Sequence, residues 1–309
     1  MRNIVYLFLI TLFACNSAQT QVLEKIALPL KGGHTTSCVL VKPKTEKIKG
    51  VLVLIAGFGQ TAEHVFPESK IPEIAHAHDL LTVSVGFGAK MYADSAVVND
   101  LNEIVETVLH QYGVDKTDFI FGGFSIGGAI AVRYVEYCKE QPDKFPVVPR
   151  GVFAVDSPVD LIDLWYYFER EMARDFDPTG VAEAKYVADI LKKEIGTPET
   201  NRPQYELLTP FDRNKNTPGN EQYLKTVPLR VYHDLDINWY LKNRRRSAYD
   251  CNFPNSSELI NRLMGMGNKA AEFVVGKTGY RSNGTRHPHA WSIVDETAFV
   301  EWANKLFQD

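Results

Sequence analysis

Short apolar runs alternate with amphipathic helical patterns along most of this chain. Runs such as residues 51–56 and 80–85 are mostly apolar and lack the strict alternation of a half-exposed strand. They are therefore typical of parallel strands that are buried on both faces. Between such runs, residues 95–112 place apolar side chains on one side of a helix. This order predicts an α/β fold with one mostly parallel sheet and helices on both faces.

The pattern defines the expected elements. The strands are residues 22–30, 36–41, 51–56, 80–85, 119–121, 151–155, 229–233 and 271–275. The helices are residues 71–78, 95–112, 126–139, 181–193, 258–266 and 296–307. A Lys-Gly-Gly turn between the first two strands indicates an opening hairpin. From about 161 to 225 the alternation stops, and we interpret this part as an insertion over the sheet edge.

The composition is that of an ordinary globular protein. The chain has 309 residues, of which 45% are apolar and 23% charged, which is enough for one large α/β domain with an insertion. A net charge of −4 does not indicate nucleic-acid binding. The one basic cluster, Lys-Asn-Arg-Arg-Arg at 242–246, is interpreted as a solvated helix face, with anion binding as the alternative.

The first residues follow the pattern of a secretory signal peptide. The apolar run 4–13 follows a positive start and is too short to span a bilayer. Cleavage after Ala18 would leave a soluble domain of residues 19–309. Alternatively, Leu-Phe-Ala-Cys15 resembles a bacterial lipobox, in which residues 1–14 are removed and Cys15 is lipidated. Either route predicts an exported protein, secreted, periplasmic or lipid-anchored, with that lipid as its one membrane contact.

The other cysteines do not indicate a framework. The spacing of Cys38, Cys138 and Cys251 suggests neither a disulfide scaffold nor a metal site, and each is expected to be a small buried apolar residue. The chain has no phosphate-binding loop with a lysine and no zinc-ligand spacing. No metal and no cofactor is therefore expected.

A serine motif lies between an expected strand and an expected helix. Residues 122–128 read Gly-Gly-Phe-Ser-Ile-Gly-Gly, which places Ser125 in a Gly-x-Ser-x-Gly sequence at a strand-to-helix turn. In that context the motif presents a nucleophile. The turn is so sharp that a bulky residue two positions before or after the serine would clash with a neighbouring strand or helix. Gly123 and Gly127 avoid this clash.

A serine hydroxyl needs a base, and the base needs a carboxylate to orient it. His289, between the last strand and the closing helix, is the expected base, with His287 as the runner-up. For the acid, Asp236 fits best just after the seventh strand, and Asp234 follows. Asp156, one strand earlier, is a further alternative. Aspartates at such positions also cap turns and helices, so each of the three also has a purely structural reading.

An attacked carbonyl also needs hydrogen-bond donors for its oxyanion. The backbone N–H of Ile126 follows the nucleophile directly. The second N–H is expected from the small-residue turn 56–60 after an earlier strand, from Phe58 first and Gly59 next. The Gln60 side chain is a candidate to assist.

These features together resemble the α/β-hydrolase superfamily. The resemblance rests on the order serine, acid, histidine, on the elbow at 122–128, on the Gly-Phe-Gly turn at 57–59 and on His289-Ala-Trp, and it extends from about 22 to 307. One departure is Ala56, which stands where a histidine commonly precedes the first glycine of that turn. Because the oxyanion donors are backbone groups, this departure concerns the hydrogen bonds that support the loop.

The resemblance implies a fold and an activity. The fold is an eight-stranded sheet with a cap at about 161–225, after the sixth strand. The activity is that of a serine hydrolase with a triad of Ser125, Asp236 and His289, acting through an acyl-enzyme on a small-molecule or peptide substrate. An ester carbonyl is favoured over an amide. The aromatic residues 165–168 are equally suited to line the substrate pocket or to fill the core.

Two rival functions are weighed against a hydrolase. Residues 57–62 match Gly-x-Gly-x-x-Ala, a form of the dinucleotide fingerprint, but the next strand ends at Gly-Phe-Gly, residues 86–88, without the acidic residue that would hold a ribose. The second rival is a non-catalytic binding protein on the same fold. Its sign would be a missing triad member, and candidates for all three members are present.

Overall fold

A mixed sheet organises the molecule. The computed structural model describes residues 25–27 and 36–308. The predicted signal segment with Cys15 and Ala18, and the turn of the opening hairpin, lie outside these residues. The strands are β1 (Lys25–Ala27), β2 (Ser37–Val41), β3 (Gly50–Ile55), β4 (Leu80–Gly86), β5 (Phe119–Phe124), β6 (Gly151–Val155), β7 (Leu229–His233) and β8 (Ala271–Val275).

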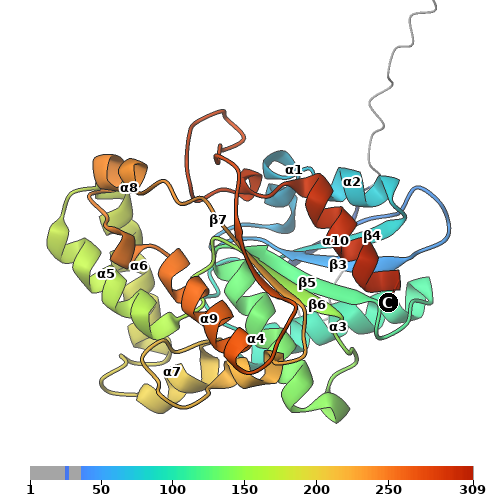
Figure 1. The fold of residues 1–309 in the computed structure, drawn as a ribbon, viewed down its shortest axis with the longest axis horizontal. Helices are drawn as coiled ribbons and strands as arrows, with labels where there is room; N and C mark the ends of the chain where they lie inside the picture. Colours follow the sequence, from blue (N-terminus) through green and yellow to red (C-terminus); the bar gives the residue numbers. More distant parts are fainter. Residues whose placement is uncertain (1–24, 28–35, 309) are drawn as a thin grey trace, which may run out of the picture.

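The strand order is β1-β2-β4-β3-β5-β6-β7-β8 (Figure 1). β1 pairs antiparallel with β2, and β2 pairs antiparallel with β4, whereas every pair from β4 to β8 is parallel. The prediction of a mostly parallel, eight-stranded sheet is confirmed. The carboxyl ends of the parallel strands meet at one edge, where ligands bind in open α/β sheets.

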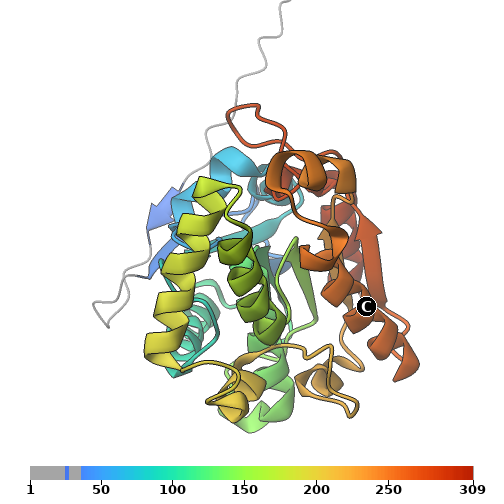
Figure 2. The ribbon, with the colours of Figure 1, turned by 90° about the vertical axis from the view of Figure 1, so that its left-hand side faces the viewer.

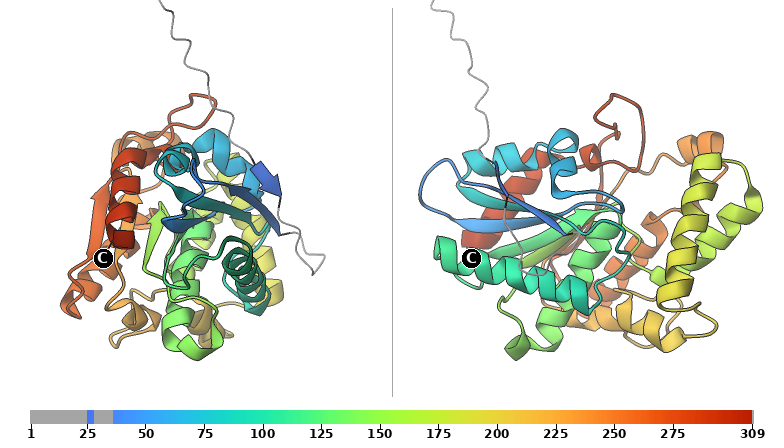
Figure 3. Two further views of the ribbon diagram at one scale, coloured as in Figure 1. Left: turned by 90° about the vertical axis from the view of Figure 1, so that its right-hand side faces the viewer. Right: turned by 180° about the vertical axis from the view of Figure 1, so that it is seen from behind.

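Helices cover both faces of the sheet, as Figures 1 and 3 show. The helices are α1 (Val65–Glu68), α2 (Ile71–Ala77), α3 (Ser95–Tyr112), α4 (Ile126–Glu140), α5 (Leu161–Arg174), α6 (Pro178–Glu194), α7 (Arg202–Leu208), α8 (Ile237–Arg244), α9 (Phe253–Gly265) and α10 (Glu296–Gln308). Alternate residues of β3 enter opposite apolar clusters, one with α3, α4 and α9 and the other with α1, α2 and α10. Burial on both faces explains why the central strands β3, β4, β5 and β6 are apolar almost throughout.

Three of these helices, α5, α6 and α7, lie in the β6–β7 segment (residues 156–228). α5 and α6 pack side by side at one end of the sheet (Figure 2). The apolar faces of the three helices form a third cluster, which also includes Ile126, the first residue of α4. The β6–β7 segment therefore packs directly against the turn that carries Ser125.

Other features of the described residues are simple. No helix in this part of the chain is long and apolar enough to cross a membrane. Cys38, Cys138 and Cys251 are buried, as expected of small apolar residues, and none of them forms a disulfide with another described residue.

Candidate active site

Ser125 occupies a strained turn between β5 and α4. Its backbone has φ 54° and ψ −128°, a conformation that residues other than glycine rarely adopt. A Cβ atom on Gly123 or Gly127 would lie under 3.0 Å from the carbonyl oxygen of Ile55 in β3. The predicted need for glycine on both sides of the serine is therefore confirmed. Strain of this kind persists only where the surroundings enforce it, and it is common at active sites.

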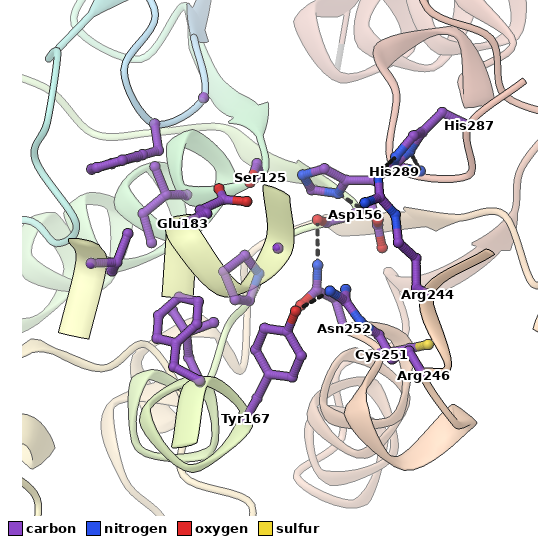
Figure 4. A pocket seen from close by; sticks show the side chains of 18 of the residues that line it. Ser125, Asp156, Tyr167, Glu183, Arg244, Arg246, Cys251, Asn252, His287 and His289 are labelled. Carbon is purple, nitrogen blue, oxygen red and sulfur yellow. Dashed lines mark hydrogen bonds and ion pairs between the residues drawn. The ribbon is translucent and has the colours of Figure 1, made fainter. Parts of the chain in front are cut away.

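His289 is held by Asp156. The Nδ1 atom of His289 lies 2.6 Å from Oδ2 of Asp156 (Figure 4). The ring points from this contact toward Ser125, and both residues line one pocket. Among the hydrogen bonds of the described residues, none joins Ser125 Oγ to His289. Such bonds are often long before substrate binds and tighten in the complex.

The other carboxylate oxygen of Asp156 accepts a hydrogen bond from a second imidazole. The Nδ1 atom of His233, the last residue of β7, lies 2.7 Å from Asp156 Oδ1. Burial acts to raise the pKa of Asp156, but the hydrogen bonds from His233 and His289 outweigh it and hold this pKa well below its usual range. The carboxylate is therefore ionised at neutral pH and can orient the His289 ring.

His233 was not predicted as part of the site. Its side chain is fully buried and stacks on Phe273 with ring centroids 5.3 Å apart. Its Nε2 atom is buried and has no hydrogen-bond partner among the described residues. Because β6 and β7 are parallel neighbours in which Val155 pairs with Tyr232, the next residues along, Asp156 and His233, come together at the strand ends. This pairing was the signal that could have revealed the contact.

The acid predicted first takes another position. Asp236 accepts a hydrogen bond from Trp239 N at 2.9 Å and so caps α8, and its other oxygen pairs with Arg286 at 2.9 Å. Asp234, the second choice, also pairs with Arg286 at 2.9 Å and accepts from Gly279 N. The assignment of Asp236 is corrected in favour of Asp156, the third candidate, because only Asp156 reaches His289.

These two acids still serve the loop that carries the histidine. Arg286 and Gly279 lie in the 276–290 loop that leads from β8 to His289. Asp234 and Asp236 therefore tie that loop to the end of β7. This is the capping and turn role that aspartates often have after strands.

His287, the second candidate base, has a supporting position. Its Nδ1 atom accepts a hydrogen bond from the backbone N–H of His289 at 3.1 Å. Burial, with the nearby His289, Arg281 and Arg244, lowers its pKa to about 3. His287 is therefore neutral at physiological pH and holds the backbone of His289 in place. Among the described residues, no carboxylate contacts it that would orient it as a base.

In the turn after β3, residues 56–60, one backbone N–H group is available to bind an oxyanion. Gly59 N donates to Gly88 O at 2.8 Å, and Gly57 N donates to the Gln60 side chain at 2.8 Å. The N–H of Phe58 donates to no described residue. The Ile126 N–H is the first of α4 and has no partner within the helix. The Gln60 side chain thus supports the turn that a histidine at the position of Ala56 commonly supports in this fold. This role replaces the assistance to the oxyanion that was considered for Gln60.

Ser125, Asp156 and His289 share a pocket of about 320 Å³. Its opposite wall comes from α5 and α6 of the β6–β7 segment, including Leu164, Phe168 and Val187. Of the aromatic residues at 165–168, Tyr167 and Phe168 line this pocket. Trp165 is buried in the cluster of the β6–β7 segment, with its ring centroid 6.5 Å from that of Tyr205. The run therefore divides between pocket and core.

The basic cluster at 242–246 also divides. Lys242 and Arg245 are exposed, whereas Arg244 and Arg246 line the pocket. Arg245 follows α8 in a left-handed conformation, with φ 49°. This turn interrupts the helical spacing, so the residues on either side of Arg245 both face the pocket. The prediction of a solvated helix face is wrong for these two residues.

Many solved structures share this fold. Carboxyl esterase 2 of the mycorrhizal fungus Tuber melanosporum has a TM-score of 0.57 at 15% identity, over 96% of this chain and 89% of that one. The hyperthermophilic esterase of the archaeon Pyrobaculum calidifontis has a TM-score of 0.57 at 16% identity, over 93% and 83%. The acylaminoacyl peptidase of Pyrococcus horikoshii has a TM-score of 0.58 at 15% identity, over 93% of this chain and 42% of the peptidase.

The sequence itself matches no protein-family model and no curated protein. The structural neighbours are members of the α/β-hydrolase superfamily, and this chain has the α/β-hydrolase fold. At these identities the likeness defines the fold, and the chemistry has to be argued from the site.

Proposed function

We propose that the protein is a serine hydrolase that cleaves a carboxylic ester through an acyl-enzyme. Ser125 Oγ attacks the carbonyl carbon while His289 takes its proton. Nδ1 of His289 is engaged with Asp156, so Nε2 is the atom that receives this proton and returns it to the departing alcohol. Water then attacks the acyl-enzyme by the same route and releases the acid. The observation that carries the proposal is the 2.6 Å contact between His289 and Asp156 in the pocket of the strained Ser125.

The N–H groups of Ile126 and Phe58 bind the negative charge that forms on the carbonyl oxygen. Both are backbone groups in fixed turns, so they need no rearrangement during the reaction. The backbone strain at Ser125 supports this arrangement, because it projects the hydroxyl above the sheet edge.

An ester is favoured over an amide as the substrate. Esterases prevail among the structural neighbours, although an acylaminoacyl peptidase is also present. The helices of the β6–β7 segment form the proposed cap, since they supply the wall that faces Ser125. A peptide amide on the same machinery is the second candidate.

A serine-reactive fluorophosphonate probe tests the proposal. The wild-type protein should be labelled, and Ser125→Ala should abolish the labelling. Folded wild-type protein that reacts with neither probe nor ester would favour a binding protein on this fold. Labelling that persists in Ser125→Ala would overturn Ser125 as the nucleophile.

Removal of the base should be equally decisive. His289→Ala should lower kcat for a 4-nitrophenyl ester by about 10⁴- to 10⁶-fold, by analogy with other serine hydrolases. His110→Ala, an exposed change on α3, is the matched control and should leave kcat unchanged. Near-normal turnover by His289→Ala would remove the assigned base.

A further inference from the structure

Two arginines in the pocket have no carboxylate partner. Most arginines in the described part of the chain form ion pairs, and Arg244 at the pocket rim pairs with Asp177. Arg246 and Arg281 also line the pocket, and neither forms an ion pair with any described residue. Charged side chains that lie away from bulk water are normally paired. Both side chains are only partly exposed in the pocket, and neither has an ion-pair partner among the described residues.

Arg246 is held in place by aromatic residues. One terminal nitrogen donates to the Tyr167 hydroxyl, and the guanidinium lies over the Tyr167 ring, 4.3 Å from its centroid. The Nε atom is buried and has no acceptor among the described residues. Burial acts to lower the pKa of Arg246, but Tyr167 and Glu171 outweigh it and raise this pKa, so the group stays charged. Glu171 forms its ion pair with Arg174, and no described carboxylate forms one with Arg246, which leaves its charge available to an anionic ligand.

Arg281 lies nearer to the catalytic groups. Its guanidinium is 5.6 Å from the ring centroid of Phe124, the residue before Ser125. Burial lowers the pKa of Arg281, and the nearby Glu68, Asp156 and Glu183 offset this only in part. An added negative charge in the pocket would therefore be favourable for this group as well.

The carboxylates that line the pocket limit where an anionic group can bind. Asp156 is bound to two histidines and Asp177 to Arg244, which leaves Glu183 as the lining carboxylate without an ion pair among the described residues. Figure 4 shows Arg246 beside Tyr167, to whose hydroxyl it donates a hydrogen bond. An anionic group in the pocket would be repelled by Glu183 and attracted to Arg246.

We propose that the substrate of this pocket carries a carboxylate that binds Arg246, with Arg281 adding to the positive field. The inference deepens the proposed hydrolase function and rests on it. The planar fork of a guanidinium matches the two oxygens of a carboxylate. The substrate class is thus a small ester whose acyl or alcohol part bears a carboxylate at a distance from the carbonyl that Ser125 attacks.

Pairs of esters that differ in one carboxylate group test this inference. The acyl side is tested with 4-nitrophenyl hydrogen glutarate against 4-nitrophenyl pentanoate. The alcohol side is tested with 3-(butanoyloxy)benzoate against phenyl butanoate. In at least one pair the wild-type kcat/KM should favour the anionic ester by about 10- to 100-fold, the value of a charged hydrogen bond. The preference should shrink in 0.5 M NaCl because salt screens the attraction.

Variants locate the effect. Arg246→Gln should remove the preference for the anionic ester, measured as the ratio of the two kcat/KM values within each pair. Arg245→Gln is the matched control, because that exposed side chain lies over Phe176 and does not line the pocket. If Arg246→Gln does not fold, Arg281→Gln should reduce the same preference.

The outcomes separate this inference from the proposed function. A wild-type enzyme that hydrolyses neutral esters but prefers no anionic ester overturns the inference and leaves the hydrolase intact. If the folded protein hydrolyses no ester and is not labelled, the proposed function fails. In that case calorimetry with glutarate and with 3-hydroxybenzoate decides the inference, since binding that Arg246→Gln abolishes supports it and absence of binding overturns it.

Discussion

At the scale of single residues, Asp156 is the centre of the site. It accepts His233 at 2.7 Å through one oxygen and His289 at 2.6 Å through the other, so both oxygens of its carboxylate are fixed. Its backbone carbonyl also accepts a hydrogen bond from Asn252 at 2.8 Å. An acid held from three directions cannot rotate away from the imidazole that it orients.

A pair of amide substitutions compares the two candidate acids. Asp156→Asn should lower kcat by about 10⁴-fold, because an amide can stabilise the wrong tautomer of His289. Asp236→Asn should retain kcat within about tenfold and cost about 1 kcal/mol of stability, since it weakens only the cap of α8 and one contact to Arg286. Steady-state kinetics on one 4-nitrophenyl ester measures both. A loss in Asp236→Asn as large as that in Asp156→Asn would contradict the assignment.

The predictions that were wrong, for the acid and for Arg246, have a common physical reason: both depend on the path of the chain after a strand or helix ends. Ser125 and His289 are recognisable from local context, whereas the acid depends on which strand ends lie side by side. Whether Asp156 or Asp236 meets His289 is decided by loop paths that the chain order does not specify. Arg246 was misjudged because one left-handed residue, Arg245, reverses the direction of the chain after α8.

At the scale of elements, the parallel strands were the most predictable part. The predicted ranges of β6, β7 and β8 and of α3 agree with the structure at both ends, because short runs rich in β-branched and aromatic residues and a capped amphipathic helix are strong local signals. The helices α1, α5, α7 and α8 were not predicted. α1 and α7 are short and α8 is weakly amphipathic, so the local pattern carries little of their signal. α5 has a strong amphipathic pattern and was missed because its aromatic run was interpreted only as part of an insertion.

The tight turn between β5 and α4 makes a prediction at this scale. Gly127→Ala should destabilise the protein by about 1 to 3 kcal/mol, because the new methyl group would press on the backbone of β3. Gly265→Ala, at the end of α9, is the matched control, since a Cβ atom there has no neighbour within 4 Å. Urea unfolding measures both. Equal stability of the two variants would show that the elbow tolerates a side chain.

At the scale of the whole molecule, the candidate site contributes to the stability of the fold, because its residues lie at the ends of the sheet strands. Asp156 and His233 lie at the ends of β6 and β7, and His289 reaches them from the segment before α10, so the site links distant parts of the chain. The pKa of Asp156 is lower in the folded protein than its ordinary value of 3.8, because the two imidazoles outweigh the effect of burial. This carboxylate therefore stabilises the fold above its unfolded pKa.

The pH dependence of unfolding should show this link. The contribution is complete above about pH 4 and is lost as the pH falls toward the depressed pKa of the folded state. The difference in unfolding free energy between wild type and Asp156→Asn should accordingly be largest near neutral pH and shrink between pH 4 and pH 2.5. Urea titrations at several pH values measure it. A difference that stays constant over this range would mean that Asp156 is not ionised in the folded protein.

The location of Asp156 directly after β6 has a consequence for how the protein can vary. Since the acid proposed to orient His289 follows the strand next to β5, which leads into Ser125, the proposed triad takes no member from residues 237–250. We therefore expect substitutions of Arg244 and Arg246, the two arginines of that stretch that line the pocket, to change the preference among esters more than the rate of acyl transfer.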